Sequence, residues 1–285
     1  MVSDGSAAIS ETSSPVAATS SEVATTSSVL ELVDAAALED FVRTAADLLA
    51  LDASTLRLLA EESLRHYRGR QHYVARFASL ERRWYASLCD ATPDFSVYYD
   101  AYLLADLWAC WVIYSRHYLR SAARVGIIAE LSFVRSAVDL GSGISYSTAA
   151  LAQLLPRARV MCTSMTQDQR LLASLLAQRY GFEVFATTEN IGAVDFVFAS
   201  EYFEHFEDPI AHLHDVLRDL RQPSALLIAN SFNTRSIGHF VKYKHGEREI
   251  DGKLYGRAFN DELRALGYRQ VETSCWNARP AYWRL

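Results

Sequence analysis

The chain has 285 residues, of which 50% are hydrophobic and 22% charged, and its formal net charge is −6. This composition is typical of a globular protein with one large or two small domains. The acidic balance argues against nucleic acid as a partner, because nucleic-acid-binding domains usually carry a basic excess. Only 12 of the 285 residues, about 4%, are glycine, whereas the average is about 7%. Just two of them, Gly5 and Gly69, precede position 126. So few glycines exclude a β-fold with many turns in the first half.

The first part of the chain is predicted to be a tail followed by helices. Residues 1–28 hold 13 serine or threonine residues and no aromatic residue, so we expect a disordered tail that cannot bury enough surface to fold. From 29 to 129 the apolar spacing is helical, as in Leu30, Val33, Ala37 and Phe41. We therefore expect a helical cap or substrate region there, with Ser54 as the N-cap of one helix.

Cellular location is predicted from what the sequence lacks. The segment before Arg43 has no basic and apolar leader, so no secretory signal is expected. The most apolar stretch, 97–115, contains two aspartates, which argues against a membrane span and a membrane partner. The four cysteines show no metal-binding spacing, which favours reduced thiols in a cytoplasmic protein.

After Gly126, short apolar runs alternate with helical stretches. This order predicts a Rossmann-like, doubly wound α/β sheet over 130–285, mostly parallel with an antiparallel edge strand. The expected strands are 136–140, 158–163, 183–187, 193–200, 224–230, 268–276 and 280–285. The expected helices are 146–155, 167–180, 209–220 and 260–266, the last capped by Asn260.

The sharpest motif follows the first of these strands, in the segment Val138-Asp-Leu-Gly-Ser-Gly-Ile-Ser145. A tight turn between a strand and a helix needs residues without a Cβ atom, and it lets a ligand approach the backbone. The free N–H groups of the following helix favour an anionic or polar ligand group. The alternative is a tight turn that binds nothing.

This motif resembles the first motif of the class I S-adenosylmethionine-dependent methyltransferases. A second segment, Ser200-Glu-Tyr-Phe-Glu-His-Phe-Glu-Asp-Pro209, is similar to that of a small-molecule branch that includes ubiquinone-pathway O-methyltransferases, and Ala229–Thr234 is a weaker third match. The resemblance covers about residues 130–285 and implies S-adenosylmethionine as cofactor. It implies cofactor contacts from Asp139, Gly141, Ser142, Gly143, Ser164, Glu189, Asn190, Ser200 and Glu201.

Three positions depart from the family pattern. Ser145 replaces the third glycine of the loop, and Ser164 stands where an acidic residue usually binds the ribose hydroxyls. Serine can still hydrogen-bond a ribose, but without charge assistance, and Asp168 could substitute. The position of the usual acid near the adenine is altered to Thr187-Thr-Glu-Asn190, where Glu189 or Asn190 could take that role.

Candidate catalytic and substrate residues follow from the same segments. The predicted catalytic residues are His205, Asn230 and Tyr202, with a role for His205 as general base or, alternatively, as an organiser of its loop. The predicted substrate and cap residues are Tyr98, Tyr99, Tyr102, His239 and Tyr243, because an aromatic face attracts a sulfonium cation and a long polar insertion can bind a substrate. The histidine spacing predicts no metal site.

Three functions remain open at this point. The first is methyl transfer from S-adenosylmethionine to a small molecule. The second uses the aminocarboxypropyl arm of the same cofactor, for transfer or for cyclisation to azetidine-2-carboxylate, and releases methylthioadenosine. The third is a non-catalytic binding module. The acceptor stays unidentified, and a homodimer is compatible with the sequence.

Overall fold

The computed structural model describes residues 39, 41–43, 45–47, 52–67, 75–90, 93–99, 105, 108–109, 131–271 and 281–285. The predicted tail at 1–28 and the candidate Tyr102 lie outside these residues, and only the backbone of Tyr99 is described. Within the described part of the chain, none of the helices has the length and apolar character that a membrane crossing requires.

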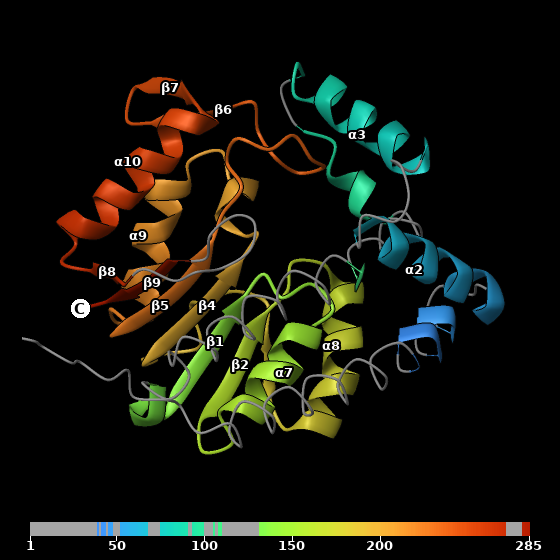
Figure 1. Ribbon diagram of the computed structural model, residues 1–285, viewed down its shortest axis with the longest axis horizontal. Helices are drawn as coiled ribbons and strands as arrows, with labels where there is room; N and C mark the ends of the chain where they lie inside the picture. The colour runs from blue at the N-terminus through green and yellow to red at the C-terminus, as the bar shows by residue number, and fades with distance from the viewer. Residues whose placement is uncertain are drawn as a thin grey trace, which may run out of the picture.

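A seven-stranded sheet forms the centre of the molecule (Figure 1), with the strand order β3-β2-β1-β4-β5-β9-β8. Its strands are β1 (Ser136–Leu140), β2 (Arg159–Thr163), β3 (Glu183–Phe185), β4 (Phe196–Ser200), β5 (Ala225–Ala229), β8 (Arg269–Val271) and β9 (Ala281–Arg284). The first five strands are parallel, and β9 runs antiparallel to both β5 and β8. The predicted doubly wound sheet with an antiparallel edge is confirmed.

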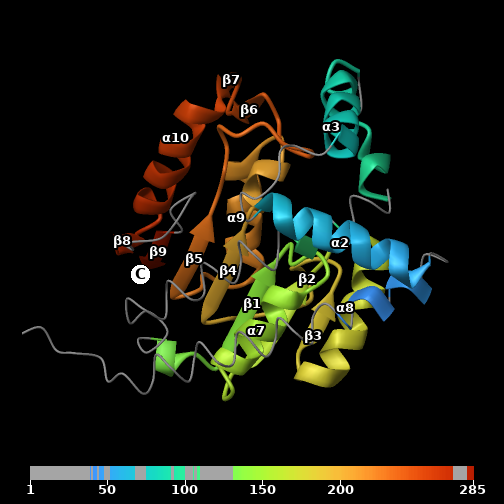
Figure 2. The same cartoon turned by 45° about the vertical axis from the view of Figure 1, so that its right-hand side comes forward.

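Both faces of the sheet are covered, so its central strands are buried throughout (Figure 2). Helices α7 (Tyr146–Leu154) and α8 (Gln167–Tyr180) pack on one face, and α9 (Pro209–Asp219) and α10 (Gly252–Ala265) on the other. Alternate residues of a strand point to opposite faces of the sheet. Ala137 therefore packs in the core under α7 and α8, and Val138 in the core under α9 and α10. Continuous apolar runs are the usual sequence of such strands.

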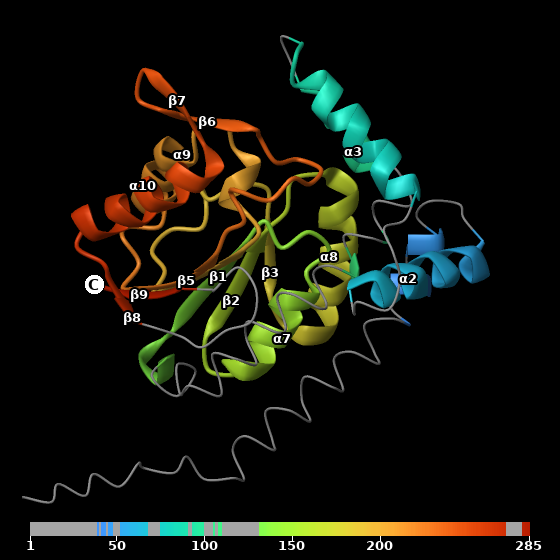
Figure 3. The same ribbon diagram turned by 45° about the horizontal axis from the view of Figure 1, so that its top comes forward.

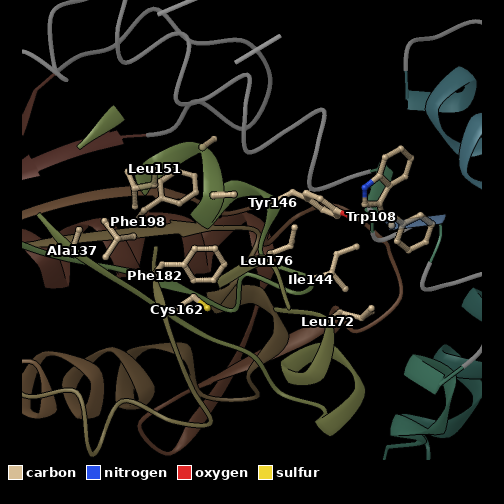
Figure 4. Close-up of a cluster of buried hydrophobic side chains, with 14 of the residues drawn as sticks. Trp108, Ala137, Ile144, Tyr146, Leu151, Cys162, Leu172, Leu176, Phe182 and Phe198 are labelled. Carbon is tan, nitrogen blue, oxygen red and sulfur yellow. The ribbon is translucent and has the colours of Figure 1, made fainter. Parts of the chain in front are cut away.

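The core beside α7 and α8 extends into the N-terminal helices (Figure 4). Phe41 stacks on Trp108 with ring centroids 5.0 Å apart, and Trp108 meets the edge of Tyr146 at 6.3 Å. All three side chains are buried. Aromatic contacts of this kind add to the free energy gained by burial, so the N-terminal region shares a core with the sheet domain.

The described N-terminal helices are α2 (Ala53–Tyr67), α3 (Ala75–Ser87) and the 3₁₀ helix η1 (Phe95–Tyr99). Asp52, not Ser54, caps α2, since its carboxylate accepts from the Thr55 N–H at 2.8 Å. A carboxylate is at least as good an N-cap as a hydroxyl, and its position one residue before the helix lets it reach the free N–H groups. Further along the chain, a short 3₁₀ helix, η3 (Leu131–Phe133), leads into β1.

Helix α3 and η1 lie beside the loop that precedes β6 (Lys242–His245), as Figure 3 shows. Leu80, Trp84 and Val97 pack with Ile237 of this loop in a small buried cluster. The indole N–H of Trp84 also donates to the His239 carbonyl at 2.8 Å. The loop between β5 and β6 is thus held by the N-terminal helices.

The start predicted for the helix in the last third of the chain is wrong. Helix α10 begins at Gly252, and its N-cap is Asp251, whose carboxylate accepts from the N–H groups of Lys253 and Leu254; the expected start at Asn260 is eight residues too late. The exposed charged segment before it forms β7 (Arg248–Asp251), which pairs with β6 in an antiparallel hairpin.

Candidate active site

The glycine loop connects β1 to α7 through three left-handed residues. Gly141, Gly143 and Ser145 have φ values of 61°, 57° and 68°. Ser145, which replaces the third glycine, therefore keeps the backbone conformation that a glycine would adopt, at a cost of about 1 kcal/mol for a residue with a side chain. The departure at Ser145 does not open or shift the turn.

The hydroxyl groups around this loop bind one another. Ser142 Oγ lies 2.8 Å from Ser145 Oγ, and Ser164 Oγ donates to the Gly143 carbonyl at 2.7 Å. The N–H of Gly141 donates to Thr163 Oγ1 at 3.0 Å. Ser142, Ser145 and Ser164 are buried, so these side chains fix the loop and leave its backbone as the surface that a cofactor would meet.

Asp139 lies within β1 and is fully buried. Its Oδ2 accepts from the hydroxyls of Ser147 and Thr148, at 2.6 and 2.8 Å, and so anchors the start of α7. Burial raises the pKa of Asp139 to about 7, although the two hydroxyl groups oppose the shift. The cofactor contact expected of Asp139 stays a prediction.

Tyr202 lies against the glycine loop, because a Cβ atom on Gly141 would overlap its ring. Its hydroxyl oxygen is 2.8 Å from Nε2 of His212 on α9. Burial lowers the pKa of His212 to about 4, so His212 is neutral near pH 7. The structure thus places the hydroxyl of Tyr202, a predicted catalytic residue, on His212.

Two carboxylates meet at the carboxyl ends of β4 and β5. Glu201 directly follows β4 with a φ of 53°, and Glu204 lies in the 3₁₀ helix η4 (Phe203–His205). Ser231, just beyond β5, holds both: its N–H donates to Glu204 Oε1 at 2.6 Å and its hydroxyl to Glu201 Oε1 at 3.1 Å. Burial and the nearby Glu201 carboxylate raise the pKa of Glu204 well above its usual value.

Two histidines complete this group. His205 and His239 meet edge to face, with ring centroids 4.9 Å apart. Burial, with a contribution from the other ring, lowers the pKa of His205 to about 3, and burial lowers that of His239 to about 4. The hydroxyl of Tyr98 in η1 lies 3.2 Å from His205 Nδ1. A residue of the N-terminal region therefore borders this group of side chains.

Several buried polar atoms at this edge have no hydrogen-bond partner among the described residues. They are Asp139 Oδ1, Ser200 Oγ, Glu204 Oε2 and Asn230 Oδ1. Buried polar groups are nearly always paired, and ligands of doubly wound sheets bind at the carboxyl ends of the strands. The unpartnered atoms of Ser200 and Asn230 therefore fit a polar cofactor beside the glycine loop.

The remaining predicted residues lie either away from this group or beneath it. Glu189 and Asn190 are exposed in the turn after β3. Tyr243 is fully buried and donates to the Glu204 carbonyl at 3.2 Å, which gives it a supporting position under η4. A cavity of about 380 Å³ opens beside α7 and α8, but neither Glu201 nor His205 lines it.

Glu204 and Ser231 are the site residues that were not predicted from the sequence. The place of Glu204 in the same short motif as Glu201 was a usable signal. Ser231 gives no such signal, since only the pairing of β4 with β5 brings it to the two carboxylates.

Part of the chain matches a known protein family. Residues 138–228 match the family model of the methyltransferase domain. A search of curated proteins finds no match.

The solved structures that match this chain include two methyltransferases and Streptomyces venezuelae DesVI, all with TM-scores below 0.5. The plantazolicin methyltransferase BpumL, in complex with a pentazolic desmethylPZN analog and SAH, is 18% identical over 55% of this chain, with a TM-score of 0.40; the match covers 62% of the BpumL chain. The methyltransferase domain of bacterial CtHen1 is 14% identical over 58% of this chain and 97% of its own, with a TM-score of 0.41. Streptomyces venezuelae DesVI is 8% identical over 65% and 98%, with a TM-score of 0.45.

The family assignment rests on the domain match together with the strand order and the glycine loop described above. Residues 138–228 match the methyltransferase domain family, and the strand order and the glycine loop agree with that match, which supports an S-adenosylmethionine-dependent transferase.

Proposed function

We propose that the protein transfers the methyl group of S-adenosylmethionine to a small molecule. The observation that carries this proposal is the set of buried polar groups at the ends of β4 and β5, closed on one side by Tyr98. Helix α3 and η1 pack against the loop that bears His239. A site bordered by these helices favours a small acceptor over a nucleic acid, in keeping with the acidic net charge of −6.

The backbone of the glycine loop would hold the methionine portion of the cofactor, with Ser200, Glu201 and Asn230 as polar partners. S-adenosylmethionine supplies an electrophilic methyl group when it is bound. The chain contributes binding and alignment, which bring an acceptor atom into line and lower the entropic cost of the reaction.

His205 is the proposed general base. Burial lowers its pKa to about 3 and keeps the ring neutral near pH 7, so the ring carries the lone pair that a general base needs, although in this buried state it is a weaker base than an exposed histidine. The hydroxyl of Tyr98 at 3.2 Å from Nδ1 would fix the orientation of the ring.

Product analysis tests the function. The purified protein is incubated with S-adenosylmethionine alone and then with a panel of small hydroxyl and amine acceptors, and every product is identified by mass spectrometry. We expect S-adenosylhomocysteine together with a methylated acceptor. Methylthioadenosine without S-adenosylhomocysteine would instead indicate use of the aminocarboxypropyl arm, and cofactor binding without any turnover would indicate a binding module.

A matched pair of histidine variants then tests the base. His205→Asn should abolish most of the turnover, whereas His214→Asn should leave it unchanged. His214 is partly exposed on α9, where it pairs with Glu262 at 2.8 Å. Equal activity in the two variants would exclude His205 as the base.

A further inference from the structure

We propose that Glu201, Glu204 and His239 bind a divalent metal ion. One ligand atom from each of these side chains lies within 4.8 Å of the others. They come from the end of β4, from η4 and from the loop before β6, so only the folded chain brings them together. The proposal replaces the expectation from histidine spacing that no metal site exists.

The geometry of His239 is that of a metal ligand. Its Nδ1 lies 2.8 Å from the Thr234 carbonyl oxygen, and because a carbonyl only accepts, the proton of the neutral ring is on Nδ1. The lone pair is therefore on Nε2. Metal-binding histidines are usually oriented in this way by a hydrogen bond from the other ring nitrogen. Trp84 fixes the backbone of the same residue through the His239 carbonyl.

The two carboxylates supply the negative charge that a cation needs. Glu204 is fully buried, and its Oε2 has no hydrogen-bond partner among the described residues. Ser231 donates once to each carboxylate, to Glu204 Oε1 and to Glu201 Oε1, and so turns both groups toward the same place. Within the described residues, no lysine or arginine forms an ion pair with Glu204. A buried carboxylate next to a half-buried one is costly without a proton or a cation between them.

The ligand types indicate the class of metal. Two carboxylates with one imidazole suit a first-row transition ion such as Mn²⁺ or Zn²⁺ better than Ca²⁺ or Mg²⁺, which prefer sites made of oxygen ligands alone. Three protein ligands leave coordination positions open, as in catalytic metal sites, where water or an oxygen atom of a small molecule completes the shell. The metal site would thus take an oxygen-bearing ligand beside His205.

Direct metal binding tests the proposal without any assay of methyl transfer. The full-length protein is treated with EDTA, dialysed and titrated with Mn²⁺, while the free ion is followed by electron paramagnetic resonance. We expect one equivalent of Mn²⁺ to bind. Failure to bind Mn²⁺ saturably at concentrations up to about 1 mM, when Zn²⁺ also fails in calorimetry, would overturn the proposal. A protein that binds the metal but shows no methyl transfer leaves the metal site in place and overturns only the proposed function.

Two variants locate the metal. Glu204→Gln keeps the size of the side chain and removes its charge. His239→Asn keeps a donor to the Thr234 carbonyl and removes Nε2. Each should weaken Mn²⁺ binding about 10- to 100-fold or more, whereas Glu262→Gln, on α10, should bind as the unaltered protein does. Unchanged binding in both site variants would place the ion elsewhere and overturn the assignment.

Thermal unfolding separates ligation from a structural role. Without metal, Glu204→Gln should unfold at the same temperature as the unaltered protein or at a higher one, because a buried charge has been removed. Mn²⁺ should raise the unfolding temperature of the unaltered protein and leave that of Glu204→Gln unchanged. If Glu204→Gln fails to fold, the shift in the unaltered protein and its loss in His239→Asn decide the question.

Discussion

The hydroxyl oxygen of Tyr98 lies 3.2 Å from Nδ1 of His205, although the two residues are 107 positions apart. Gly238 lies against both, since a Cβ atom at this position would overlap the Tyr98 hydroxyl and the His205 ring. An N-terminal helix, the turn after β4 and the loop after β5 therefore meet at one point. A substitution in any of these three segments should change the position of the His205 ring.

Removal of the Tyr98 hydroxyl tests this relationship. Tyr98→Phe keeps the buried ring and loses the contact with His205, so we expect kcat to fall about 10-fold while the KM for S-adenosylmethionine changes little. Tyr85→Phe is the matched control. It removes a hydroxyl that accepts from the Ser236 N–H at 3.0 Å in the same region but away from His205. It should lower the free energy of unfolding by about 1 kcal/mol and spare kcat. An equal loss of kcat in both variants would contradict a specific role for Tyr98.

Alanine substitutions at two glycines, Gly238 and Gly246, test how closely Tyr98 and His205 approach Gly238. Gly238 and Gly246 both have positive φ values, 86° and 62°, but nothing lies within 4 Å of a Cβ atom built on Gly246. Gly246→Ala should therefore cost only about 1 kcal/mol of backbone strain. Gly238→Ala bears the same strain and also displaces Tyr98 or His205, so it should unfold at clearly lower denaturant concentration and lose most activity. Similar urea midpoints for the two variants would argue against the crowding.

The hydroxyl network of the loop gives a prediction about cofactor affinity. Ser164→Ala removes the bond to the Gly143 carbonyl, which should loosen the loop and raise the Kd for S-adenosylmethionine about 5- to 10-fold, an effect of about 1 kcal/mol. Ser174→Ala on α8 serves as control, because its exposed hydroxyl donates to the Arg170 carbonyl at 2.8 Å. Isothermal titration calorimetry compares the two, and equal affinity would show that Ser164 does not support the loop.

The buried carboxyl of Asp139 predicts a pH dependence of stability. Its pKa is about 7 in the folded protein and near 3.9 in the unfolded chain. Between these values the folded state binds the proton that the unfolded state has released, so stability falls as pH rises from about 4 to 7. The full penalty above pH 7 is about 4 kcal/mol.

Asp139→Asn should remove the share of this decline that Asp139 contributes, because the amide does not titrate, while its oxygen can still accept from Ser147 and Thr148. The share contributed by Glu204, whose pKa is also raised, should remain. Urea unfolding at pH 5, 6, 7 and 8 measures the effect. Asp94→Asn is the comparison: Ser96 and Arg83 lower the pKa of Asp94, so Asp94 loses its contribution as pH falls, and its variant should retain the decline above pH 5. The same pH profile for Asp139→Asn and the unaltered protein would show that Asp139 is not the group responsible.

The sequence predicted the elements of the sheet domain well where local signals, such as capping residues and apolar runs, determine their bounds. Helix α8 begins and ends as predicted, with the left-handed Gly181 directly after it. Strand β1 has the predicted bounds. The start of helix α10 was placed too late because Asn260 was taken as the N-cap, whereas Asp251 caps the helix. The structure explains Gly252 by a tertiary contact, since a Cβ atom there would overlap the Phe232 carbonyl.

The candidate site was predictable only in part, because some of its residues are brought together by tertiary contacts and not by local sequence. The glycine loop and Glu201 stand in short motifs, so the chain order was enough to find them. The grouping of Glu204 with Ser231 and His239 depends on which strands pair and on how a long loop folds back. Spacing rules for metal ligands look for residues on one helix or in one loop, and this group belongs to three separate segments.

Strand β9 lies between β5 and β8 and pairs with both. During synthesis, β1 to β5 emerge long before residues 281–284, so the outer edge of β5 stays without a partner until these four residues arrive. An apolar strand with an open edge can pair with another chain. We therefore expect truncation before residue 281 to yield aggregated protein in cells, and expression with a chaperone that shields open strands to improve the yield of the complete chain.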